Sequence, residues 1–253
     1  MEFPTALLGV ALGTVILPSL VKHSAAAEPA EFSRLIDWGL RLTVLLALPA
    51  AVGLTVLAVP LLCTMFWHGE FARADVMATR LALWGYTVGL LGIIAVKVLA
   101  PGFYARQDVK TPMKVAAAAL VITQLGNAFC LLLLPPWVAG MQHAVLALTI
   151  SIGALFNAGM LLWLLKKRGI YLPEPHWGAF TLKVVVALYL MLGVLWFAVG
   201  GAQGLTSGSR WFSFALAERV LQLAWIVPLA AATYFGALAL MGVRIHQFVR
   251  RES

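Results

Sequence analysis

Charged residues are scarce in this chain of 253 residues: they make up 11% of it, against 62% hydrophobic residues, and the mean hydropathy is +0.94. Soluble domains average about 25% charged and about 45–50% apolar residues, and a soluble fold of this length could not bury so much apolar surface. The composition therefore excludes an ordinary soluble enzyme, a disordered chain and a collagen. Two cysteines exclude a disulfide framework. What remains is an all-α, polytopic transmembrane helix bundle.

Catalytic and metal-binding patterns are also lacking. The five histidines lie in loops, in the tail or at the ends of hydrophobic runs, and none pairs with another at metal-ligand spacing. No two carboxylates share a hydrophobic run, so we expect no enzyme activity, no metal site and no cofactor. Cys63 and Cys130 are expected to be small packing residues, although a bridge between them stays open.

Seven hydrophobic runs approach the length of about 20 residues that a helix needs to cross a bilayer. The first is short, and it is no signal peptide, because Glu2 stands where a basic residue would be expected. We interpret it as a span whose beginning is missing. The runs are Phe3–Leu20, Leu42–Trp67, Leu81–Phe103, Met113–Pro135, Ala144–Leu165, Ala179–Gly200 and Val220–Val243.

Basic residues predict the orientation of these spans. There are 18 Lys and Arg against 10 Asp and Glu, for a net charge of +8. In a membrane protein this excess indicates cytoplasmic loops rather than nucleic-acid binding. Alternate loops hold twelve and four basic residues, so the C-terminus is predicted to be cytoplasmic. The twelve are Lys22, Arg34, Arg41, Arg106, Lys110, Lys114, Lys166, Lys167, Arg168, Arg244, Arg250 and Arg251; the four are Arg73, Arg80, Arg210 and Arg219.

The segment Glu31–Arg41 has apolar residues at helical spacing and polar residues on the opposite face. This pattern predicts an amphipathic helix that lies along the cytoplasmic interface before it turns into the second span. It fits either a solvated helix start or a lipid-binding role. Asp37 and Arg41, four residues apart, are expected to pair weakly if exposed.

Two ionisable residues are candidates for a substrate cavity, because a charge in hydrocarbon is costly and tends to face a cavity. Lys97 lies six residues before Phe103 in the third span. It either faces a cavity or snorkels to the headgroups. Glu2 precedes the first span and becomes buried if further residues extend that helix. Lys183, near the start of the sixth span, is expected to snorkel.

Small residues at four-residue spacing are candidates for close helix packing or bending. They are Gly9 and Gly13 in the first span and Gly85 and Gly89 in the third, where Gly92 follows. In the fourth span, Gln124 and Asn127 share a face, which indicates hydrogen bonding to another helix.

Four stretches resemble the MurJ/MviN family of lipid II flippases, within the multidrug/oligosaccharidyl-lipid/polysaccharide exporter superfamily. The first is EFPTALLGVALGTVILPSL at Glu2–Leu20, which LIDWGLR follows at Leu35–Arg41. Another is KVLAPGFYARQDVKTPMK at Lys97–Lys114, and the last is the KKRGIY loop. The resemblance runs collinearly over essentially the whole chain.

The resemblance implies a fourteen-span parent with two lobes around a cavity and two extra C-terminal helices. Residues 1–167 would then be a partial second lobe, and residues 168–253 the C-terminal helix pair with a basic cytoplasmic tail. It implies transport of the lipid-linked peptidoglycan precursor from the cytoplasmic to the periplasmic leaflet of the bacterial inner membrane, by alternating access.

The implied partners are that precursor, membrane lipids and the missing N-terminal half, which would carry the first lobe. Two alternatives stay open: a non-transporting membrane interaction module, and a small-molecule exporter of the same superfamily.

Overall fold

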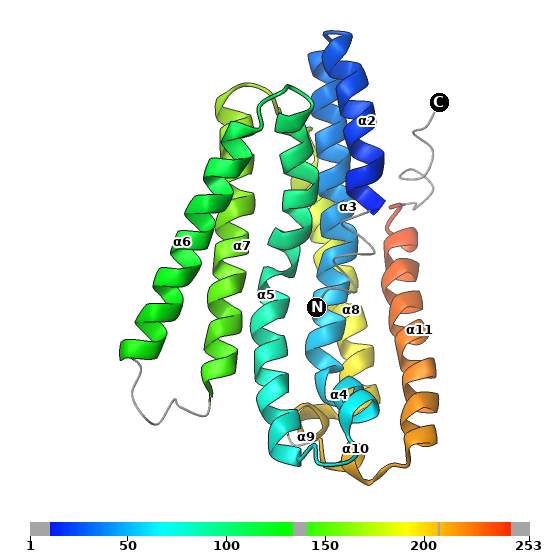
Figure 1. Ribbon diagram of the computed structural model, residues 1–253. Helices are drawn as coiled ribbons and strands as arrows, with labels where there is room; N and C mark the ends of the chain where they lie inside the picture. The colour runs from blue at the N-terminus through cyan, green and yellow to red at the C-terminus, as the bar shows by residue number, and fades with distance from the viewer. Residues whose placement is uncertain (1–10, 134–140, 207, 244–253) are drawn as a thin grey trace. The chain divides into compact units, whose positions relative to one another are not determined.

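The computed structural model describes residues 11–133, 141–206 and 208–243 (Figure 1). Every regular element in these ranges is a helix, in agreement with the all-α prediction. The helices are α2 (Ala11–Ala25), α3 (Pro29–Val56), α4 (Ala58–Phe66), α5 (Arg73–Tyr104), α6 (Lys110–Leu133), α7 (Gln142–Lys167), α8 (Trp177–Val199), α9 (Gly201–Thr206), α10 (Ser209–Ser213) and α11 (Leu216–Leu240).

Six of the described helices are long and apolar enough to cross a membrane: α3, α5, α6, α7, α8 and α11. This confirms the multi-pass helical class. The first predicted span, Phe3–Leu20, lies partly outside the described residues. Its described part belongs to α2, which has 15 residues. The count of seven spans therefore stays a prediction.

The second predicted span is not one continuous helix. Over Leu42–Trp67 the structure has the end of α3 and the whole of α4, separated at Leu57. Pro60 stands four residues after Val56, the last residue of α3. A proline ring clashes with the carbonyl four residues earlier, which explains why the helix is interrupted here. Leu57 still donates to the Gly53 carbonyl at 2.8 Å, so the break leaves its N–H satisfied.

The prediction of a separate interfacial helix over Glu31–Arg41 is wrong. These residues form the start of α3, which runs from Pro29 to Val56 without a turn. Their apolar side is buried: Phe32 is 2% exposed and Ile36 0%. On the polar side, Asp37 is also buried, with 1% of its surface exposed. At Asp37 protein therefore covers the polar side as well, whereas Glu31 and Arg34 on that side are exposed.

The chain divides into two compact units. Unit 1 comprises residues 1–48 and 85–177, and unit 2 comprises residues 49–84 and 178–253. In unit 1, α6 and α7 run side by side, as Figure 1 shows in green. In unit 2, α4 packs against α10 and α11.

A buried arginine joins α11 to α4 within unit 2. Arg219 is 5% exposed and donates from Nη1 to the Cys63 carbonyl at 2.8 Å. A second bond runs from Nη2 to the Phe212 carbonyl at 3.4 Å. The carbonyl of Cys63 lies in the last turn of α4, where the helix itself supplies no donor. Cys63 and Cys130 are both free thiols.

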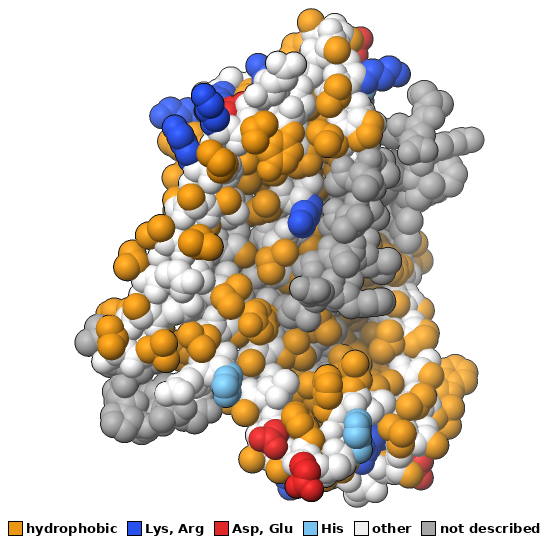
Figure 2. All heavy atoms as spheres, viewed as in Figure 1, with side chains coloured by type: hydrophobic (Ala, Val, Ile, Leu, Met, Phe, Trp, Pro, Cys, Tyr) orange, Lys and Arg blue, Asp and Glu red, His pale blue; other side chains and the backbone are white. Residues whose placement is uncertain are grey.

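Basic side chains gather at one end of unit 1. Figure 2 shows Lys and Arg over the α5–α6 loop and the adjoining end of α7, above a surface dominated by hydrophobic side chains. The hydrophobic surface includes much of α6, where Leu120, Leu125 and Phe129 are more than half exposed. We call the end of unit 1 that carries these Lys and Arg side chains the basic end of unit 1. Charge at the helix ends and apolar side chains along them match a bilayer environment.

Candidate functional site

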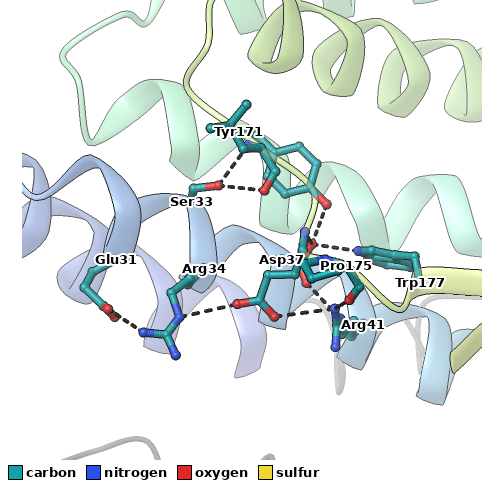
Figure 3. Close-up of polar contacts among 10 residues, drawn as sticks. Glu31, Ser33, Arg34, Asp37, Arg41, Tyr171, Pro175 and Trp177 are labelled. Carbon is teal, nitrogen blue, oxygen red and sulfur yellow. Dashed lines mark hydrogen bonds and ion pairs between the residues drawn. The ribbon is translucent and has the colours of Figure 1, made fainter. Parts of the chain in front are cut away.

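A buried carboxylate organises the polar contacts at the basic end of unit 1. Asp37 of α3 accepts hydrogen bonds from the Tyr171 hydroxyl at 2.6 Å and from Trp177 Nε1 at 2.7 Å, both on Oδ1. Its Oδ2 lies 2.8 Å from Nε of Arg41, one helical turn later. Figure 3 shows these side chains converging on Asp37. We call this group of four residues the Asp37 clasp.

The clasp fastens the segment between α7 and α8 to α3. The Glu174 amide also donates to Asp37 Oδ1 at 3.3 Å. Four residues before Asp37, Ser33 Oγ donates to the Leu172 carbonyl at 3.0 Å and accepts from the Leu172 amide at 2.9 Å. Backbone groups of the segment therefore hydrogen-bond to side chains on one face of α3. These bonds satisfy backbone N–H and C=O groups that, outside a helix, have no helical partner.

Gly169 turns the chain toward the clasp. Its φ of +67° lies in the left-handed region, where glycine carries no steric penalty. Gly169 donates to the Lys166 carbonyl at 3.0 Å, and Ile170 donates to the Leu165 carbonyl at 3.0 Å. These two bonds form a Schellman motif, which ends α7 and redirects the chain. The glycine in the KKRGIY stretch thus positions Tyr171 for its contact with Asp37.

Electrostatics favour a closed clasp. Arg41 is also 3.4 Å from Glu174, and Arg34 bridges Glu174 at 3.3 Å and Glu31 at 2.6 Å. Burial, together with the hydrogen bond to Asp37, raises the pKa of Tyr171 well above its usual value of about 10. The hydroxyl therefore stays protonated at physiological pH and remains a donor to the carboxylate.

A second polar cluster links the Lys97–Lys114 stretch to the KKRGIY stretch. Asp108 accepts from the amide of Thr111 at 3.0 Å and from its hydroxyl at 2.6 Å, just before α6 begins. Arg168, directly after α7, donates to Asp108 at 2.6 Å and to Thr111 at 3.0 Å. The Thr111 and Arg168 bonds hold the pKa of Asp108 down, at about 2. The cluster thus contributes stability above the ordinary Asp pKa of about 4, which is lost as the pH falls toward 2.

The predicted small-residue stripe of α5 lies against α7. A Cβ built on Gly85 would be 2.9 Å from the Ala144 carbonyl oxygen, and one on Gly89 would be 2.6 Å from Cα of Ser151. Ser151 Oγ in turn donates to the Gly85 carbonyl at 2.6 Å. The two helices therefore approach so closely that only glycine fits at these positions.

The remaining candidate residues are spread over the chain. Lys97 is exposed on α5 and is not one of the residues of the Asp37 clasp. Glu2 and Gly9 lie outside the described residues, and Gly13 is in α2 with surroundings that are not described. The hydrogen bonding expected of the fourth span is present, because Thr149 of α7 donates to Asn127 of α6.

No described group of three or more His, Cys, Asp or Glu side chains could hold a metal ion. The polar clusters of unit 1 consist of ion pairs and hydrogen bonds that join helices to loops. Their arrangement suits holding a helix bundle together at its charged end.

Sequence reasoning missed the clasp. Asp37 and Arg41 were expected to pair, weakly if exposed; the pair is present, but Asp37 is buried. Tyr171 belongs to the KKRGIY stretch, but nothing in the sequence indicated that Tyr171 or Trp177 contacts Asp37. The two hydrogen bonds span 134 and 140 residues.

Comparisons with known proteins cover nearly the whole chain. The family model for the lipid II flippase MurJ matches residues 1–216. A lipid II flippase MurJ from Burkholderia cenocepacia is 44% identical over 252 residues, which are 99% of this chain and 46% of that protein. A probable lipid II flippase MurJ from Haemophilus influenzae is 36% identical over 258 residues, covering 100% of this chain and 48% of that protein. The chain thus spans about half the length of these relatives.

The fold agrees with a solved structure. A chain described as lipid II flippase MurJ in an inward closed conformation superposes with a TM-score of 0.64 at 21% identity. The superposition covers 94% of this chain and 45% of that chain. The family model extends over far more than half of the sequence, and the resemblance carried by the four motif stretches is confirmed: the chain belongs to the MurJ family of lipid II flippases.

Proposed function

We propose that this chain forms the second lobe, in part, and the C-terminal helix pair of a lipid II flippase. The observation that carries the proposal is the 44% identity to the Burkholderia cenocepacia flippase over 99% of the chain. The cargo would be the lipid-linked peptidoglycan precursor, carried from the cytoplasmic to the periplasmic leaflet of the bacterial inner membrane. The division into residues 1–167 and 168–253 is part of this proposal.

The mechanism proposed is alternating access, in which two lobes move around a shared site. This chain would contribute one lobe. The Asp37 clasp and the glycine contacts between α5 and α7 support the idea, because they make unit 1 a stiff body. A stiff lobe can rock as a whole instead of deforming locally.

The functional test is rescue of a bacterial strain depleted of its own flippase. We expect residues 1–253 alone to give no growth, because one lobe cannot enclose a site that two lobes share. Co-expression with the N-terminal half of the Burkholderia cenocepacia relative should restore growth. Growth with this chain alone would contradict the two-lobe requirement. No growth from the pair, with both halves present in the membrane, would contradict the flippase assignment.

Lys97 is proposed to line the transport cavity. It is exposed on α5, and in the described residues it forms no ion pair. In the co-expressed pair, Lys97→Met should lower lipid II transport roughly tenfold or more, because one charge contact with an anionic headgroup is worth about 1.5–3 kcal/mol. Lys183→Met on α8 is the matched control and should transport normally. Equal transport by both variants, at equal membrane levels, would remove Lys97 from the cavity.

The C-terminus is proposed to be cytoplasmic, on the basis of the twelve-to-four distribution of basic residues. After removal of Cys63 and Cys130, single cysteines at Gly169 and Gly208 would be treated with an impermeant thiol reagent. In intact cells we expect labelling at Gly208 and none at Gly169 until the membrane is permeabilised. The reverse pattern would invert the topology.

A further inference from the structure

Unit 1 contains an apolar pocket that the flippase proposal does not use. It has a volume of about 420 Å³ and lies among α3, α5 and α7, within the range of about 300–1,000 Å³ typical of ligand sites. Leu40 of α3, Leu99 of α5 and Leu162 of α7 are among the side chains that line it. A pocket with such walls does not hold ordered water well, but it takes apolar ligands.

The pocket has the length of one bilayer leaflet. Along α7 it extends from Leu155 to Lys166, and at a rise of 1.5 Å per residue this is about 16 Å. That is about half of the 30 Å hydrocarbon core. It begins at the basic end, where Tyr171 and Trp177 of the clasp form part of its wall. Tyr and Trp are the residues enriched at the membrane interface.

Glycine leaves room for a chain inside the pocket. Gly159 lines it, and a Cβ at this position would meet no atom within 4 Å. At Gly85 and Gly89, by contrast, a Cβ would collide with α7. The glycine at 159 is therefore not required by helix packing, and it widens the pocket at mid-depth.

The mouth of the pocket is positively charged. Lys166 is its only charged lining residue, is exposed, and has Nζ 5.8 Å from the Tyr171 ring centroid. No carboxylate in the described ranges forms an ion pair with it. The acidic groups of the clasp region, Asp37 and Glu174, are already paired with arginines. Lys166 is thus available for an anion from outside the protein.

We propose that this pocket binds an anionic phospholipid, with one acyl chain inserted along α7 past Gly159 and the phosphate on Lys166 Nζ. An apolar channel of leaflet length with one cation at its interfacial end has the dimensions and charge of such a lipid. The lipid would fill the space between α3, α5 and α7. The inference does not depend on which cargo the parent protein moves.

Native mass spectrometry of the purified 253-residue chain tests the site. The ligands are phosphatidylglycerol and phosphatidylcholine with identical acyl chains. We expect phosphatidylglycerol to bind at least fivefold more tightly. Gly159→Leu, which fills the pocket, should weaken phosphatidylglycerol binding at least tenfold. Gly193→Leu on α8, where a Cβ also meets nothing within 4 Å, is the matched control and should bind like the unmodified chain.

The headgroup contact has its own pair of variants. Lys166→Gln should abolish the preference for phosphatidylglycerol, whereas Lys167→Gln should keep it, because Lys167 does not line the pocket and its Nζ lies over the Trp163 ring. Lys166 is exposed, so its replacement does not disturb folding. Equal losses for the two lysines, or unchanged binding by Gly159→Leu, would overturn the proposal. So would a polyprenyl phosphate that displaces phosphatidylglycerol at equal concentration from the unmodified chain, since it would assign the pocket to isoprenoid carriers.

Discussion

Replacing Asp37 by alanine is expected to lower the free energy of unfolding by about 3–5 kcal/mol, the range for removing one partner of a buried ion pair. The change removes the carboxylate that lies 2.8 Å from Arg41 and that accepts the hydrogen bonds from the Tyr171 hydroxyl and the Trp177 indole. Denaturant titration of the purified chain in detergent measures the loss. The segment after α7 should also be released, so trypsin should cleave after Arg168 faster than in the unmodified chain.

Glu174→Ala is the matched control for Asp37. Glu174 also pairs with Arg41, but its side chain is 35% exposed, against 1% for Asp37. Exposed ion pairs contribute about 0–1 kcal/mol, so this variant should unfold almost as the unmodified chain does. Asp37→Asn keeps an acceptor oxygen and should fall between the two. A loss from Glu174→Ala as large as that from Asp37→Ala would show that burial of the carboxylate does not matter.

Gly89→Ala should destabilise the chain by about 1–3 kcal/mol, the usual cost of overpacking. The new methyl group would be 2.6 Å from Cα of Ser151, and since this is a backbone atom, α5 and α7 must separate. Gly193→Ala is the control, and it should stabilise the chain. A Cβ there has open space, and alanine is favoured over glycine in a helix by about 1 kcal/mol. Thermal unfolding of the two variants in the same detergent compares them directly, and stabilisation by both would refute the close contact.

Local patterns in the sequence predicted the helices but not all of their ends. Continuous apolar runs suffice to identify spans, because a bilayer requires every backbone group to be bonded within the helix. The interruption at Leu57 could have been inferred from Pro60, whose effect on the residue four positions earlier is local. The unbroken start of α3 could not have been inferred in this way, because it depends on which residues cover Asp37.

For the candidate site, local sequence patterns predicted even less of the structure. Four-residue spacing of Gly85 and Gly89 indicated close packing, but it carried no information on which helix approaches. The motif stretches that contain Asp37 and Tyr171 were singled out separately, and nothing in their patterns indicated that one hydrogen-bonds the other. Such a contact is set by tertiary packing, which periodicity within one helix does not encode.

The separation of the clasp along the chain also sets an order of events during synthesis. Asp37 emerges 134 residues before Tyr171, and at about 5–20 residues per second this is an interval of about 7–27 s. For that time the carboxylate has only Arg41, in its own helix, as a partner in the clasp. A nascent chain halted before Tyr171 would therefore present an incompletely satisfied acidic group on a hydrophobic helix. Insertion factors that shelter polar residues in membrane segments would have this interval in which to contact α3.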